Sequence, residues 1–106
     1  MDSKLRIILK DLRARLEAIY GDRLVRLVLY GSQARREGAE DSDIDVVVVL
    51  KGPLAYWEEL RRTEETVASL CLEHDAVVST IFLTPEEADE SKNPIPVSIR
   101  REGIAV

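Results

Sequence analysis

Two aspartates, Asp43 and Asp45, lie one residue apart where a long apolar run begins. Because alternate side chains of a β-strand point to the same face, a strand here would project both carboxylates side by side. Like charges at close range disfavour joint ionisation, and a divalent cation between them relieves the repulsion. Mg²⁺ favours a few carboxylate oxygens together with water and substrate phosphates. The pair therefore indicates a Mg²⁺ site that handles phosphates, with an unliganded polar strand start as the alternative.

A second segment that could bind phosphates is Gly31-Ser32, which directly follows another apolar run. Glycine permits a tight turn and the close approach of a ligand, and backbone amides at a helix start favour phosphate oxygens. The hydroxyl of Ser32 adds a donor, and Arg35 with Arg36 could neutralise phosphate charge. We interpret the segment as a phosphate cradle. The alternative is an ordinary strand-to-helix turn beside two solvated arginines.

Two other calcium and phosphate motifs are excluded by the residues present. The aspartates from Asp41 to Asp45 match the opening of an EF-hand loop. However, Val46 stands where that loop needs glycine, and Gly52 where it needs glutamate. The segment at Gly31 has no Gly-Lys-Ser/Thr, so it is not a Walker-type P-loop.

The apolar pattern predicts the elements that would position these groups. A helix is expected to open at Asp2 or Ser3 and to end at Gly21-Asp22. Its apolar residues recur at three- and four-residue steps: Leu5, Ile8, Leu12, Leu16 and Ile19. Residues 24–30 and 44–50 are typical of strands bounded by turn formers. The unbroken apolar character of 44–50 predicts burial on both faces of a sheet.

The second half of the chain continues this alternation. An amphipathic helix with a solvated charged face is predicted to bury most of its apolar residues: Leu54, Trp57, Leu60, Val67, Leu70 and Cys71. Residues 76–83 predict a third strand, and the residues from Thr84 to Glu87 a helix start with Thr84 as its cap. Short helical turns are expected within 34–36 and 97–102, and residues 104–106 are expected to close the sheet or contact a partner.

This order of elements predicts the fold class. It is α/β (α+β), with a small mixed sheet flanked by helices. The length of 106 residues predicts a single domain over residues 1–106.

Composition limits the classes of function. The formal net charge of -5 at pH 7 argues against a general nucleic-acid binder, which usually presents a basic face. No apolar run approaches the roughly 18 residues of a membrane span, so no membrane partner is expected and the cytoplasm is the expected location. The single cysteine, Cys71, excludes an internal disulfide and is expected in the core. His74 is expected at an exposed turn.

The combined pattern resembles a known family. It resembles the signature of the nucleotidyltransferase superfamily related to DNA polymerase β. The resemblance lies in a predicted strand followed by Gly31-Ser32-x-Ala34-Arg35, then a loop, and then Asp41-Ser42-Asp43-Ile44-Asp45 at the start of an apolar strand. The length and the downstream segment 98–104 resemble the minimal nucleotidyltransferase family, which includes antitoxins of HEPN/MNT toxin–antitoxin pairs.

The resemblance implies a role for each matching residue. Gly31 and Ser32 match the pair that holds the nucleoside triphosphate, and Asp43 and Asp45 match two metal-binding carboxylates. Arg35 matches the arginine that follows the family's alanine. The next position departs from the family, because Arg36 stands where glycine is usual, which widens the loop.

The resemblance also implies a third acidic ligand from a neighbouring strand. Asp75 is the candidate, at the start of the predicted third strand. Another alignment puts Ser79 at this position, and serine cannot replace a metal-binding carboxylate. Since Asp75 and Ser79 would share one strand face, alternation does not choose between them.

The leading hypothesis is a Mg²⁺-dependent nucleotidyltransferase with two Mg²⁺ ions and ATP as substrate. It would move a nucleoside monophosphate, by resemblance AMP, onto an acceptor hydroxyl and release pyrophosphate, chiefly through placement and charge neutralisation. The resemblance implies a HEPN-type helical protein as partner. One alternative is an antitoxin, a binding module that covers this partner with weak or no catalysis. A nucleotide-binding regulatory domain without transfer activity is another. A complete three-carboxylate site would separate these hypotheses.

Overall fold

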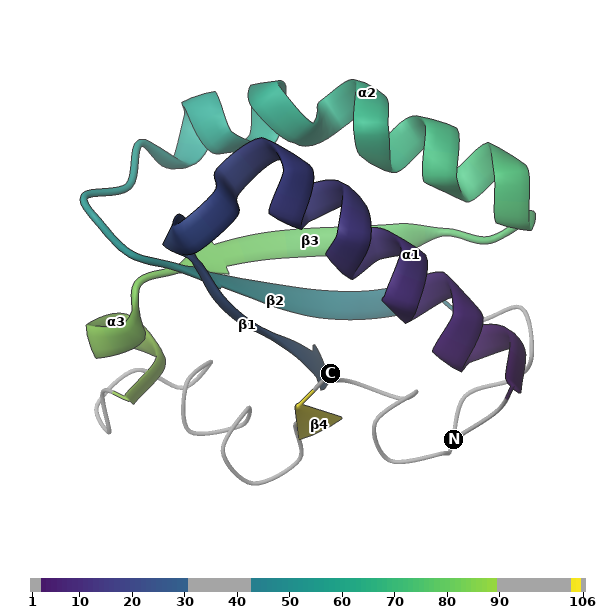
Figure 1. The fold of residues 1–106 in the computed structure, drawn as a ribbon, viewed down its shortest axis with the longest axis horizontal. Coiled ribbons are helices and arrows are strands. Elements are labelled where there is room, and N and C mark those ends of the chain that lie inside the picture. The colour runs from purple at the N-terminus through teal and green to yellow at the C-terminus, as the bar shows by residue number, and fades with distance from the viewer. Residues whose placement is uncertain (1–2, 31–42, 90–103, 106) are drawn as a thin grey trace.

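The computed structural model describes residues 3–30, 43–89 and 104–105. In these residues a four-stranded sheet lies beneath two long helices (Figure 1). The strands are β1 (Leu24–Tyr30), β2 (Ile44–Leu50), β3 (Val78–Leu83) and β4 (Ile104–Ala105), in the spatial order β3-β2-β1-β4. This is the expected α+β architecture, a small sheet flanked by helices.

The sheet is mixed, as the order of elements predicted. β1 pairs antiparallel with β2, and β2 pairs parallel with β3. β4 pairs antiparallel with β1 on its other side, so residues 104–105 extend the sheet as expected. The prediction for β2 is also confirmed, because the run from Val46 to Leu50 is fully buried at the centre of the sheet.

The first helix, α1 (Ser3–Tyr20), has the predicted bounds. Its buried residues follow the helical period: Leu5, Ile8, Leu9, Leu12, Leu16 and Tyr20. Gly21 follows with a φ of 56°, in the left-handed region that glycine adopts readily at a helix end. A 3-10 turn, η1 (Gly21–Arg23), then leads into β1.

The second helix, α2 (Tyr56–His74), has the predicted charged outer face, but the prediction of its buried face was partly wrong. Trp57 is 72% exposed and Leu60 is 40% exposed, whereas Glu59 and Thr63 are buried. The other apolar residues predicted to be buried do pack in or against the core: Leu54, Val67, Leu70 and Cys71. Two polar residues therefore take the inner stripe near the start of this helix.

The buried Glu59 carboxylate explains that difference. The Tyr20 hydroxyl donates a hydrogen bond of 2.9 Å to Glu59 Oε1, and Arg62 Nη1 donates to the same oxygen at 2.9 Å. Arg23 Nη2 lies 3.6 Å from Glu59 Oε2. Burial and the Glu59 carboxylate together raise the pKa of Tyr20. A buried charge is tolerated when it is paired and hydrogen-bonded, and this cluster ties α1 and η1 to α2.

The far end of α2 contacts α1 through a second charged cluster. Arg15 binds the Asp11 carboxylate at 3.0 Å and also Glu73, and His74 Nε2 lies 2.7 Å from Asp11 Oδ2. Arg15, and after it His74, lowers the pKa of Asp11. The expectation of an exposed turn at His74 was therefore wrong, because this half-buried residue ends α2 against α1.

Beyond α2 the chain enters β3 later than predicted. The helix continues to His74, and Asp75 is its C-cap with a φ of 50°. β3 consequently begins at Val78 instead of Ala76. The apolar pattern predicts a strand start two residues before the observed one, and errors of this size are common at element boundaries.

A short helix, α3 (Pro85–Asp89), follows β3 and begins as predicted. The Thr84 amide donates to Glu87 Oε1 at 2.9 Å, and the Glu87 amide donates to Thr84 Oγ1 at 3.1 Å. These reciprocal bonds are the predicted capping box.

The two faces of the sheet carry separate cores. Val46 and Val48 point to the main core beneath α1 and α2. Val47 and Val49 point to the opposite face, where they pack with Ala88 of α3. None of the helices described here combines the length and the apolar character of a membrane span.

Candidate functional site

The two aspartates lie at the start of the central strand. Asp43 directly precedes β2 and Asp45 is its second residue. Asp45 has the parity of Val47 and Val49, so it shares their face of the sheet, opposite α1 and α2. Asp43 is exposed and Asp45 is half-buried. The alternation of β2 therefore supports the side-by-side placement expected from the spacing, with Asp43 one residue outside the strand.

The electrostatics of Asp45 match the repulsion argued from the sequence. Burial raises the pKa of the Asp45 carboxyl, and the charge of Asp43 raises it further. Both effects disfavour the ionised form in the absence of a positive charge. A cation placed between the two carboxylates would reverse the second effect.

The register of β1 against β2 places the end of β1 beside Asp45. Tyr30, the last residue of β1, pairs with Asp45. Gly31 and Ser32 follow Tyr30 directly in the sequence. Gly31, Ser32 and Arg35 themselves lie outside the described residues, as do the turns predicted within 34–36 and 97–102.

On the other side of Asp45 the neighbouring residue is Ser79. β2 and β3 are parallel, and Asp45 pairs with Ser79 in their register. The same alternation continues along the pair, with Val47 beside Ile81 and Val49 beside Leu83 on the face that α3 covers. Ser79 is exposed. Its hydroxyl therefore belongs to the same face of the sheet as the Asp45 carboxylate.

Asp75 occupies a different position from the one expected. It caps α2, on the helix layer that covers the other face, and is not part of β3. Within the described residues, which include Asp43, Asp45 and Asp75, no group of three or more His, Cys, Asp or Glu side chains could hold a metal ion. The structure thus brings Asp43 and Asp45 together and does not bring Asp75 to them.

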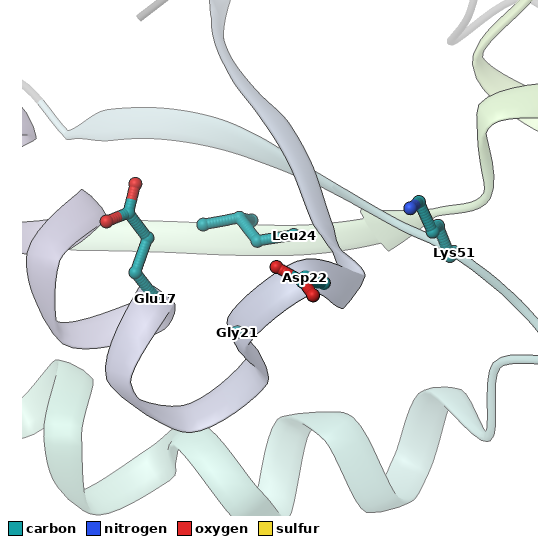
Figure 2. A pocket seen from close by; sticks show the side chains of 5 residues that line it. All are labelled: Glu17, Gly21, Asp22, Leu24 and Lys51. Carbon is teal, nitrogen blue, oxygen red and sulfur yellow. The ribbon is translucent and has the colours of Figure 1, made fainter.

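A hollow of about 520 Å³ lies at the opposite end of the sheet (Figure 2). It is open and mostly polar, and its lining comes from α1, η1 and the β1 and β2 ends: Glu17, Gly21, Asp22, Leu24 and Lys51. Leu24 pairs with Leu50 at one end of the β1–β2 ladder, whereas Tyr30 pairs with Asp45 at the other. The length of the strands therefore separates this hollow from the two aspartates.

The family model of the nucleotidyltransferase domain matches residues 5–104 of the chain. The chain belongs to this nucleotidyltransferase domain family. The match includes both aspartates, the Gly31-Ser32 pair and β4. It confirms the resemblance to nucleotidyltransferases and places the chain in that class of enzyme.

Individual proteins agree with the family. A protein of Methanocaldococcus jannaschii with the provisional name protein adenylyltransferase MJ0141 is 30% identical over 75 residues, which are 71% of this chain and 75% of the relative. A solved structure provisionally described as a minimal nucleotidyltransferase is 27% identical, with a TM-score of 0.54, and the match covers 92% of this chain and 95% of that one.

A third similar structure is a toxin–antitoxin with AMP-PNP. It has a TM-score of 0.64 and 18% identity, and the match covers 98% of this chain and 72% of that chain. At that identity it supports the fold alone. These neighbours confirm that the α+β architecture is that of a nucleotidyltransferase domain.

Proposed function

We propose that this nucleotidyltransferase domain transfers AMP from ATP to a hydroxyl group on a protein partner. The observation that carries the proposal is the register of Tyr30 beside Asp45. Tyr30 directly precedes Gly31-Ser32 in the sequence, and its pairing with Asp45 supports a site in which that segment and the carboxylate pair act together. A phosphate cradle and a pair of carboxylates side by side are what a nucleoside triphosphate with a divalent cation requires.

The donor set fits Mg²⁺. Asp43 and Asp45 offer carboxylate oxygens on one face, and Asp45 gains most from a nearby cation because burial and Asp43 already raise its pKa. Mg²⁺ commonly uses one or two carboxylates and completes its ligands with water and substrate phosphates. When bound, the ion supplies charge neutralisation and holds the reacting oxygens.

The chain's own groups then have distinct tasks in the transfer. Gly31 and Ser32 bind the triphosphate through amides and a hydroxyl, and Arg35 offsets its negative charge. The acceptor oxygen forms a bond to the α-phosphorus of ATP while the bond from that phosphorus to the oxygen bridging to the β-phosphate breaks. The electron pair leaves with pyrophosphate, and the proton of the acceptor hydroxyl passes to water. Placement and charge neutralisation supply most of the rate increase in such reactions.

The choice of AMP and of a protein acceptor rests on similar proteins. The Methanocaldococcus jannaschii relative carries the provisional name of a protein adenylyltransferase, and a structural neighbour is a toxin–antitoxin with AMP-PNP. A helical partner of the HEPN type and a location in the cytoplasm are further parts of the proposal, and the HEPN partner comes from the family resemblance of the sequence.

A second function is favoured by one specific observation. Within the described residues no third carboxylate joins Asp43 and Asp45 in a group that could hold a metal ion, and Asp75 lies in the helix layer. An antitoxin that covers its helical partner with little or no transfer activity would need no further ligand. The two functions are compatible, and activity separates them.

The test is intact-mass spectrometry of the helical protein encoded by the neighbouring reading frame. It is incubated with this chain, ATP and Mg²⁺, and we expect a gain in mass of one AMP unit that disappears with Asp45→Asn. A complex that forms without any gain in mass would support the antitoxin function instead. Loss of complex formation as well would contradict both.

A further inference from the structure

Ser79 has no role in the function proposed above, yet it lies beside Asp45 on the neighbouring strand β3, on the same face of the sheet. The parallel register pairs the two residues directly, and adjacent strands lie about 4.8 Å apart. Ser79 is exposed, so its hydroxyl faces solvent beside the carboxylate. Along the same ladder the next two pairs are apolar and packed in the α3-side core. The polar end of this face is therefore made by Asp43, Asp45 and Ser79.

We propose that Ser79 is the third side chain, beside Asp43 and Asp45, at the cation end of the nucleotide site, and that its uncharged hydroxyl makes divalent cation and nucleotide bind together instead of one after the other. This inference rests on the proposed function. A hydroxyl adds a hydrogen-bond donor and an oxygen acceptor but no charge. With two carboxylates the site attracts a free cation weakly, because affinity depends on the number of charged ligands. The triphosphate brings the missing negative charge and oxygens.

Asp75 does not add a third carboxylate to Asp43 and Asp45. The residue caps α2 with a left-handed backbone conformation, and no metal-binding group of three forms with it among the residues described. The nearest elements to Ser79 on its own face are β2 and the α3-side core, whose facing side chains are Asp45, Val47 and Ile81. Of these, only Asp45 is charged.

The experiment titrates Mn²⁺ alone, AMP-PNP alone and the two together, by calorimetry, into the parent and four variants, of which Asp45→Asn tests the proposed function itself. Ser79→Asp should tighten the binding of Mn²⁺ alone by about tenfold or more, because it adds a third carboxylate. Ser79→Ala should weaken binding of the Mn²⁺–AMP-PNP pair by about 2- to 12-fold, the net effect of one hydrogen bond. Ser69→Asp is the matched control, since Ser69 is exposed on α2 and adds the same charge to the other side of the sheet.

Thermal unfolding provides a readout independent of nucleotide. In the presence of a chelator, Ser79→Asp should melt about 5 °C below the parent at pH 7, because a third carboxylate joins two that already repel. Excess Mn²⁺ should restore the melting temperature in Ser79→Asp and have no such effect in Ser69→Asp. The cooperative transition itself confirms that each variant folds.

The experiment distinguishes failure of the proposed function from failure of the role proposed for Ser79. If Asp45→Asn binds the Mn²⁺–AMP-PNP pair as tightly as the parent, the proposed function is wrong. If Asp45→Asn loses that binding but Ser79→Asp and Ser69→Asp bind free Mn²⁺ equally, only the role of Ser79 is refuted. Tight binding of Mn²⁺ alone by the parent would also refute it.

Discussion

Replacement of Glu59 by alanine should strongly destabilise the fold while leaving the nucleotide site intact. Glu59 is buried under the junction of α1, η1 and α2. Its carboxylate accepts hydrogen bonds of 2.9 Å from the Tyr20 hydroxyl and from Arg62, and lies 3.6 Å from Arg23. The site at Asp43 and Asp45 is on the opposite face of the sheet.

The expected loss follows from the partners that remain. The hydroxyl of Tyr20, itself buried, would lose its acceptor, which costs about 1–3 kcal/mol. Removing the one buried methylene that Glu59 has and alanine lacks adds about 0.8 kcal/mol. Arg23 and Arg62 contribute little to the loss, because their side chains are 37% and 45% exposed and water can solvate them. The sum is about 3 kcal/mol, or a fall in melting temperature of about 12 °C or more for a domain of this size.

Urea denaturation followed by circular dichroism measures this directly. The midpoint should fall with little change in slope, since the surface exposed on unfolding stays similar. Glu58→Ala is the matched control, because Glu58 is the exposed neighbour on the same helix, and it should change stability by less than about 0.5 kcal/mol. Tyr20→Phe in the same background should show coupling of about 0.5–3 kcal/mol. A Glu59→Ala domain as stable as the Glu58→Ala control would refute the account of this cluster.

Three further predictions concern the site. Asp45→Asn should abolish binding of ATP with Mg²⁺ in calorimetry. The same substitution should also raise the melting temperature at pH 7. The folded-state pKa of Asp45 lies above its ordinary value of 3.8, so the ionised carboxylate lowers folding stability at pH 7. The rise in melting temperature should vanish below pH 3.8, where Asp45 is protonated in both the folded and the unfolded state. Gly31→Val should weaken nucleotide binding, because a β-branched side chain crowds the phosphate approach and resists a turn; parent-like affinity would contradict the phosphate cradle. Asp75→Asn should leave AMP transfer and partner binding close to those of the parent, because Asp75 caps α2 and forms no metal-binding group of three among the described residues; a sharp loss of transfer with partner binding retained would show that Asp75 completes the metal site.

Most of the fold could be predicted from periodicity because burial follows the period of each element. The strand 44–50 is apolar on both faces and lies at the centre of the sheet, with a core on each side. The capping box at Thr84 and Glu87 is a local feature that two side chains and two amides determine. Neither prediction depended on distant parts of the chain.

The errors came from tertiary contacts. The outward position of Trp57 depends on Glu59 lying inward, and Glu59 is buried because Tyr20 and Arg23, far away in the sequence, supply its partners. A signal was present in the sequence, since Glu59 and Thr63 stand four residues apart on the stripe that reaches Leu70, but a charged residue is ordinarily predicted to face solvent. His74 was misplaced for the same reason, through its contact with Asp11.

The sequence pattern predicts the carboxylate pair of the candidate site, but it leaves two alternatives, Asp75 and Ser79, for the third position. Parity could not separate Asp75 from Ser79 because both would share a face if the strand began early. The boundary decides between them: α2 continues through His74, so Asp75 leaves the strand and Ser79 falls beside Asp45. The position of one helix end, which sequence patterns define poorly, thus determines which residue of β3 lies beside Asp45.

The two faces of the sheet also divide the main core from the proposed binding site. The main core and the Glu59 cluster lie on the side of α1 and α2, whereas Asp43, Asp45 and Ser79 lie on the other side, at the end of β2 away from α3. Asp45 lowers folding stability when ionised, since burial and Asp43 both oppose its charge. A cation–nucleotide complex that relieves this opposition must stabilise the folded state, by an amount that grows with ligand concentration over Kd. The melting temperature of the parent should therefore rise with ATP and Mg²⁺ together, and Asp45→Asn should begin higher and gain nothing.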